Sequence, residues 1–281
     1  MQRLHVSPER VKREAEHHAT TSIERLARVG FIVSGVLYLI VGLLATEVAL
    51  GRGGTTTDTK GAFQTIAQHR FGSVLLGLMV AGLIGYALWR FAEALFDPLG
   101  KGDDAKGIAQ RAGYGLVGVI YLGLAASAVG VLRGAKQQSS SATTQGWSAR
   151  LLSLPFGRVL LACIGIGVIG FGCWQIYQGA TARFRKLLKQ GEMDGRVAPW
   201  LIVVSRVGLI AHGVVFGLIG GFVLLAALRA DAAEARGLDE ALQTLVQQPH
   251  GKLLLGIVAV GLMLFGAYQL ISARYRRIDV R

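Results

Sequence analysis

The chain has 281 residues, of which 52% are hydrophobic and 17% carry a charge. Soluble proteins usually have about a quarter of their residues charged, so the composition argues against a soluble domain. The net charge of +13 would indicate a nucleic-acid partner in a soluble chain. Here the apolar residues come in long blocks with Lys and Arg between them, so we attribute the charge to membrane topology and expect no nucleic acid to bind.

Six apolar blocks approach or exceed the ~20 residues that cross a ~30 Å hydrocarbon core. They lie at 29–50, 73–92, 112–132, 159–177, 207–228 and 253–273. None of the five prolines falls inside a block, so each block is expected to form a continuous helix. The sequence therefore predicts an all-α, polytopic membrane protein with six transmembrane helices.

These six spans form a two-helix unit that occurs three times. The first helix of each unit has an Arg, a Gly two residues on, a second Gly and an aromatic residue: Arg28, Gly30, Gly35 and Tyr38; Arg111, Gly113, Gly118 and Tyr121; Arg206, Gly208, Gly213 and Phe216. The second helix has Gly72, Leu76 and Trp89; Gly157, Leu161 and Trp174; Gly251, Leu255 and Tyr268. Because each unit crosses the membrane twice, its copies enter in the same direction. We predict three parallel hairpins with pseudo-threefold symmetry.

The connections set the boundaries and the orientation. We predict a polar cytoplasmic tail at 1–23, repeat 1 at 24–96, a cytoplasmic linker at 97–106, repeat 2 at 107–180, a basic cytoplasmic linker at 181–199, repeat 3 at 200–274 and a basic tail at 275–281. With both termini inside, most of the 30 Lys and Arg lie on the cytoplasmic side, which favours an N-in, C-in topology. Such basic loops also attract anionic lipid headgroups.

The outer connections contain a short amphipathic segment before each second helix. Phe63, Ile66 and Ala67 have the i, i+3 and i+4 spacing of one helical face, and residues 241–247 repeat the pattern. The corresponding stretch of repeat 2, Ser148–Pro155, keeps the apolar residues. We expect short helices lying on the outer surface.

Three features of the pattern point to a known family. They are the Arg-x-Gly opening, the Phe71-Gly72 or Phe156-Gly157 start of the second helix, and its Tyr86, Trp89 and Arg90 ending. From about Glu24 onward the chain resembles the bacterial family of the domain of unknown function 1206. The resemblance implies three tandem two-helix modules in the bacterial cytoplasmic (inner) membrane, and it implies no activity. Repeat 3 departs from the pattern, with His250 for the aromatic residue and Tyr268 for Trp.

A ring of polar groups is predicted at the cytoplasmic mouth. Its candidates are Arg28, Arg90, Glu93, Arg111, Gln175, Gln178, Arg206 and Gln269. Arg90 and Glu93 have the i, i+3 spacing of a pair, and Arg28 is placed to face Glu93. Ionisable groups within a membrane suggest function by default. We favour the alternative that these side chains anchor the interface, with Trp89, Trp174 and Tyr268 as an aromatic belt.

Two further candidates lie deeper. His212 is a candidate buried polar residue, and we expect a hydrogen-bonded packing residue rather than a proton relay. Gly213, Gly217 and Gly221 form a stripe of small residues at four-residue spacing, which predicts close helix packing. We find no spacing of metal ligands and no cofactor motif, and expect neither a metal nor a cofactor.

The function we expect is that of a non-enzymatic accessory or scaffold protein, which packs against other membrane proteins, itself or lipid. The alternative is a small-solute transporter or channel with a polar inner vestibule. An enzyme acting on lipid ranks third, because the sequence offers no nucleophile paired with a base.

Overall fold

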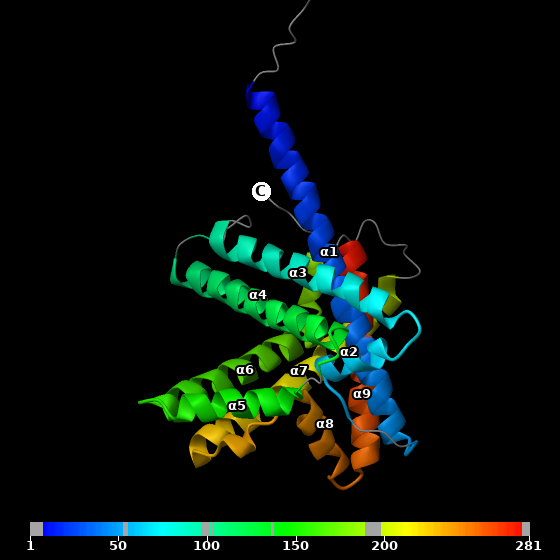
Figure 1. The fold of residues 1–281 in the computed structure, drawn as a ribbon, viewed down its shortest axis with the longest axis vertical. Coiled ribbons are helices and arrows are strands. Elements are labelled where there is room, and N and C mark those ends of the chain that lie inside the picture. The colour runs from blue at the N-terminus through cyan, green and yellow to red at the C-terminus, as the bar shows by residue number, and fades with distance from the viewer. Residues whose placement is uncertain are drawn as a thin grey trace, which may run out of the picture.

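The computed structural model describes residues 8–52, 56–96, 102, 104–135, 138–188 and 198–276. Over these ranges the chain is helical and contains no strand (Figure 1); its single β-bridge joins Leu188 to Arg276. The predicted all-α fold is confirmed.

Six helices are long and apolar enough to cross a membrane by length and composition. They are α1 (Pro8–Ala49), α3 (Gly72–Phe96), α4 (Ala105–Leu132), α6 (Gly157–Ala180), α7 (Ala198–Arg229) and α9 (Gly251–Tyr275). The six predicted spans are therefore confirmed. Helix α1 starts well before its apolar span, which begins at Arg28, and its N-terminal part extends away from the other helices (Figure 1).

One short helix precedes the second span in each of the three repeats. They are α2 (Thr59–Ala67), α5 (Ser140–Leu152) and α8 (Leu238–Val246); two 3₁₀ turns, η1 (Arg183–Leu187) and η3 (Ala232–Glu234), complete the elements. The apolar face of α2 is buried, with Phe63 and Ile66 packed against the main core. Leu242 of α8 packs into the same core. These helices therefore close the end of the bundle instead of only lying on the membrane surface.

The N-terminal ends of α2, α5 and α8 are joined by hydrogen bonds. Asp58 caps α2 by accepting from Gly61 N and also accepts from the backbone N–H of Ser140. Ser141 donates from both its backbone N–H and its hydroxyl to Asp239 of α8. Since the first-turn N–H groups of a helix have no partner inside it, each carboxylate supplies an acceptor that a neighbouring helix needs. The three repeats are thus linked at the ends that carry the short helices.

The glycine that opens each second helix permits a close turn. A Cβ at Gly72, Gly157 or Gly251 would overlap the last backbone turn of the preceding short helix. The residue before the glycine has a positive φ of 61° at both Phe156 and His250. His250 therefore keeps the backbone conformation of the aromatic residue that it replaces, and the departure in repeat 3 leaves the turn intact.

The first helix of each repeat makes its most extensive packing with the second helix of the preceding repeat. Helix α4 packs along α3, α7 along α6, and α1 along α9, so the last pair joins the two ends of the chain. Within repeats 1 and 3, α1 also contacts α3, and α7 contacts α9. The three units are therefore hairpins in connectivity, but the closest helix pairs form between repeats.

Glycines at seven-residue spacing bring two of these helix pairs together, α6·α7 and α1·α9. A Cβ at Gly213 would lie 2.6 Å from the carbonyl oxygen of Gly172, and one at Gly220 would lie 2.9 Å from that of Gly165. In the α1·α9 pair, a Cβ at Gly35 would lie 2.9 Å from the carbonyl oxygen of Gly266. Real Cβ atoms essentially never approach so closely, so only glycine fits at these seams.

Candidate functional site

The recurring arginine of the Arg-x-Gly motif binds the end of a neighbouring helix. Arg111 donates to the carbonyl oxygens of Ala94 and Leu95, at 2.9 and 3.1 Å. Arg206 donates to Gly179 and Ala180, at 3.1 and 2.9 Å.

Arg28 closes the ring in the same way, with donation to Ala273 and Arg274 of α9 at 2.5 and 2.8 Å. The last carbonyls of a helix have no partner inside it and carry partial negative charge. The motif arginines, which we expected to anchor the membrane interface, therefore join each repeat to the next by hydrogen bonds.

A second set of equivalent positions lies just after Trp89, Trp174 and Tyr268. Gln175 and Gln269 are buried at these positions, and each bonds across a helix pair. Gln269 Nε2 donates to the Ser34 hydroxyl at 3.0 Å, and Gln175 Nε2 lies 2.5 Å from His212 Nδ1. Ser34 and His212 are themselves equivalent, each six residues after its arginine. The same pair of positions thus connects α9 to α1 and α6 to α7.

His212 joins all three repeats. Only 4% of it is exposed, and its Nε2 lies 2.8 Å from the Tyr38 hydroxyl. Because the amide nitrogen of Gln175 can only donate, Nδ1 accepts and the ring carries its proton on Nε2. The imidazole also stacks on Phe265, with 3.7 Å between ring centroids. Its neutral form uses both nitrogens in these hydrogen bonds.

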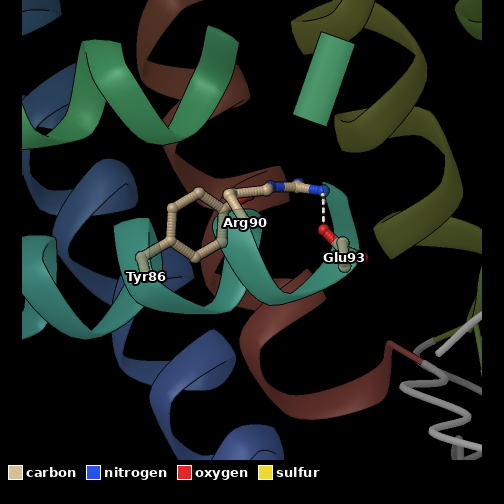
Figure 2. Close-up of polar contacts among 3 residues, drawn as sticks. All are labelled: Tyr86, Arg90 and Glu93. Carbon is tan, nitrogen blue, oxygen red and sulfur yellow. Dashed lines mark hydrogen bonds and ion pairs between the residues drawn. The ribbon is translucent and has the colours of Figure 1, made fainter. Parts of the chain in front are cut away.

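Arg90 is the third member of the set, and it is paired on its own helix (Figure 2). Its guanidinium lies 2.6 Å from Glu93 and donates to the Tyr86 hydroxyl. The residue of repeat 2 equivalent to Ser34 and His212 is Val117, which has no hydrogen-bonding side chain and packs against the buried cluster that contains Tyr86 and Trp89. The carboxylate of Glu93 supplies the acceptor that Val117 lacks.

Aromatic rings continue the polar groups into the core. Arg90 lies over the rings of Tyr86 and Tyr114, at 4.8 and 5.4 Å from their centroids. Tyr86 contacts Tyr121 with 4.5 Å between centroids, and the Tyr121 side chain lies near that of Ser34. A stripe of polar groups therefore runs from Glu93 to Ser34, and Gln269 bonds to it there.

The other predicted residues lie as follows. Gln178 is half-buried. Gly213 is at the α6·α7 seam, but a Cβ at Gly217 or Gly221 would meet no atom within 4 Å. The glycine whose Cβ would also meet the α6 backbone is Gly220, one heptad from Gly213, so the need for glycine follows a seven-residue period. The predicted Gly213–Gly217 step also lies at this contact, because the Gly217 nitrogen is 2.9 Å from the Cβ position of Gly172, but Gly217 itself has room for a side chain. Trp89 and Tyr268 are buried within the protein, and Trp174 is exposed.

Sequence reasoning missed three participants. The hydroxyls of Tyr38 and Tyr121 were hidden because their position is aromatic in all three repeats, with Phe216 in the third. Arg158 donates to the carbonyls of Ala227 and Leu228 and so joins α6 to the C-terminal end of α7. No repeated signal marks it, since repeat 1 has Ser73 at that position.

A metal site is not formed by the residues that the structure describes. Among them, no three His, Cys, Asp or Glu side chains gather where they could hold an ion. Cys163 and Cys173 are both exposed on α6.

Comparison with known proteins gives the same threefold division. The sequence model of the Domain of Unknown Function (DUF1206) matches residues 29–97, 112–182 and 207–276, one match to each repeat. The Uncharacterized protein YxxB of Bacillus subtilis (strain 168) is 35% identical over 256 residues, which cover 91% of this chain and 92% of that protein. No solved structure matches the chain. With its three matched segments spread over most of its length, the chain is a multi-pass membrane protein that belongs to the DUF1206 family.

Proposed function

We propose that the protein is a non-enzymatic scaffold of the bacterial cytoplasmic membrane that packs against other membrane proteins. The observation that carries this proposal is the use made of its polar side chains. The three motif arginines, Gln175 and Gln269 all bond to groups of another repeat. These hydrogen bonds hold the helix bundle together. None of them pairs a nucleophile with a base, as covalent catalysis requires.

The exposed apolar surface supports the same proposal. Helices α4 and α6 bury only 22% of the residues in their most apolar windows, against 39 to 50% for the other four spans. Spans that contribute so little to the interior leave faces open to a partner helix, and small residues on them permit close approach.

Photo-crosslinking in living cells tests the proposal. A benzophenone amino acid is placed singly at Leu78, Leu116, Trp174 or Leu253, which are exposed on α3, α4, α6 and α9. A scaffold should give a discrete protein adduct of constant mass from at least one face, found again by native mass spectrometry of the extracted protein. Adducts with lipid alone at all four positions, together with a monomer free of partners, would contradict it.

A small-solute transporter is the second candidate, favoured by the stripe of buried polar groups from Glu93 to Ser34. Flux of small ions and solutes into liposomes, compared between the wild-type protein and Arg90→Ala or His212→Ala, tests it. A flux that both substitutions abolish would favour transport, and the absence of flux in all three proteins would favour the scaffold.

A further inference from the structure

Two contacts close repeats 1 and 3 by holding the first helix against the second. In the first contact, a Cβ at Gly30 would overlap the ring of Tyr86, and a Cβ at Gly208 would lie 2.5 Å from the backbone nitrogen of Phe265. Gly30 and Gly208 each lie two residues after the motif arginine. Tyr86 and Phe265 each lie three residues before the aromatic residue near the end of the second helix, which is Trp89 or Tyr268. The same pair of positions therefore meets in both repeats.

The second contact lies one turn deeper. A Cβ at Gly82 would lie 2.8 Å from a methyl group of Val33, and one at Gly261 would overlap Ala211. Val33 and Ala211 each follow the motif arginine by five residues. Gly82 precedes Trp89 by seven residues, and Gly261 precedes Tyr268 by seven. Again the positions are equivalent, and the wild-type side chain on the first helix leaves room only for glycine on the second.

Repeat 2 keeps both glycines and has Phe and Leu at the other two positions, but does not bring the two pairs together. They are Gly113 with Phe171, and Leu116 with Gly167. A Cβ at Gly113 or at Gly167 would meet nothing within 4 Å, Leu116 is 62% exposed and Phe171 is 47% exposed. Figure 1 shows α4 and α6 diverging on the side away from α1 and α9.

We infer that repeat 2 is a gate that also adopts a closed arrangement, in which Gly113 meets Phe171 and Leu116 meets Gly167 as their equivalents do in repeats 1 and 3. The sequence retains both glycines, although nothing in the open arrangement needs them. A closed contact gives both glycines a use.

The helix pairs define how the gate moves. Arg111 clasps α4 to α3, while Arg206, Arg158 and a glycine seam hold α6 to α7. Closure therefore rocks two intact helix pairs toward each other and opens neither. Lipid tails are as apolar as the side chains that they cover, so leaving these faces of α4 and α6 to lipid carries little hydrophobic penalty in the open arrangement. This inference does not depend on the scaffold role.

Disulfide trapping in the full-length protein tests the gate. In a Cys163→Ala, Cys173→Ala background, the pair Leu116→Cys, Gly167→Cys reports closure of repeat 2. The equivalent pair Val33→Cys, Gly82→Cys in repeat 1 reports a contact that is already closed, because the sulfur at position 33 replaces the methyl group that lies 2.8 Å from the Gly82 Cβ position. Each protein is oxidised in lipid nanodiscs and cut at a protease site inserted after Arg133, between α4 and α5, or in the matching connection between α1 and α2 for repeat 1.

A closing gate gives a disulfide within one chain for the repeat 2 pair, formed more slowly than the disulfide of repeat 1. No disulfide in repeat 2, while the repeat 1 pair links, would overturn the inference. A disulfide between two chains would overturn it as well, because the opening would then be filled by a second copy.

A substitution that blocks closure tests the same movement through the rate at which the repeat 2 disulfide forms. Gly113→Leu has room in the open arrangement but prevents the approach of Phe171, so the repeat 2 disulfide should form at least tenfold more slowly. Gly123→Leu is the matched control, because a Cβ there also meets nothing within 4 Å and its position takes no part in the closed contacts. Equal rates for the two variants would count against closure.

Discussion

Gly213 and Gly217 lie one turn apart on α7, and substitution by alanine should affect them in opposite ways. A Cβ at Gly213 would lie 2.6 Å from the carbonyl oxygen of Gly172 and 3.0 Å from the backbone nitrogen of Ile176. Neither group is the end of a flexible side chain, so neither can rotate away. A Cβ at Gly217 would meet no atom within 4 Å. The two variants therefore separate close packing from helix propensity.

The magnitude follows from the seam. Ordinary contact begins near 3.4 Å, so α6 and α7 must separate by about 0.8 Å (3.4 − 2.6) to accept a methyl group at Gly213. A gap of ~0.5–1 Å forfeits a quarter to a half of the dispersion energy of the atoms that line it, and overpacking typically costs ~1–3 kcal/mol. Gly217→Ala meets no clash and gains up to about 1 kcal/mol in helix propensity. Gly213→Ala gains the same helix propensity, so the two free energies of unfolding should differ by the packing cost alone, about 1–3 kcal/mol.

The measurement is reversible unfolding in mixed micelles, followed by tryptophan fluorescence as the denaturing detergent is increased. Gly220→Ala should behave like Gly213→Ala, because its Cβ would lie 2.8 Å from the backbone nitrogen of Ile169. If Gly217→Ala destabilises the protein as much as Gly213→Ala does, the seven-residue seam is refuted and the four-residue stripe is restored.

Three further outcomes follow from the contacts between repeats. In a double-mutant cycle of unfolding, Gln175→Leu and His212→Leu should show a coupling of about 0.6–1.7 kcal/mol, the range for hydrogen bonds in membranes; additive effects would exclude the bond. Arg206→Gln should lower the melting temperature in detergent, because two carbonyls at the end of α6 lose a charged donor, whereas Arg150→Gln, whose guanidinium lies over Trp147 of its own helix, should not. Finally, fragments 1–103 and 104–281, when co-expressed, should purify together through a tag on either one, since the α3·α4 and α1·α9 pairs both cross the cut; separate elution would contradict the ring of pairs.

Composition and repetition were sufficient to predict the six spans and the short outer helices. Long proline-free apolar blocks leave the backbone no choice but a helix in lipid. The choice of partner for each helix follows from other forces. The prediction of three hairpins gave the connectivity of the helices, but lipid provides no hydrophobic drive between helices, and close approach depends on glycine faces. Which face meets which, such as Gly35 with Gly266, becomes visible only in three dimensions.

The candidate site was predicted in part for the same reason. The motif arginines stood out by recurrence, yet the carbonyl oxygens that they bind belong to the backbone and leave no trace in the sequence. His212 was expected to be buried and hydrogen-bonded, and it is. Its partners, Gln175 and Tyr38, lie 37 and 174 residues away, so no local spacing could have identified them.

The positions where the three repeats differ most are those that face each other between repeats. Six residues after the motif arginine, the three first helices have Ser34, Val117 and His212. Directly after Tyr268, Trp89 and Trp174, the second helices that pack against them have Gln269, Arg90 and Gln175, in the same order. Taken singly, both series look like a site that has decayed. Paired as the helices pair, they are complementary, because Gln meets Ser, Gln meets His, and Arg90, opposite a valine, is paired with Glu93 of its own helix. A buried polar group needs only one suitable partner, so each pair can change its chemistry as long as both members change together.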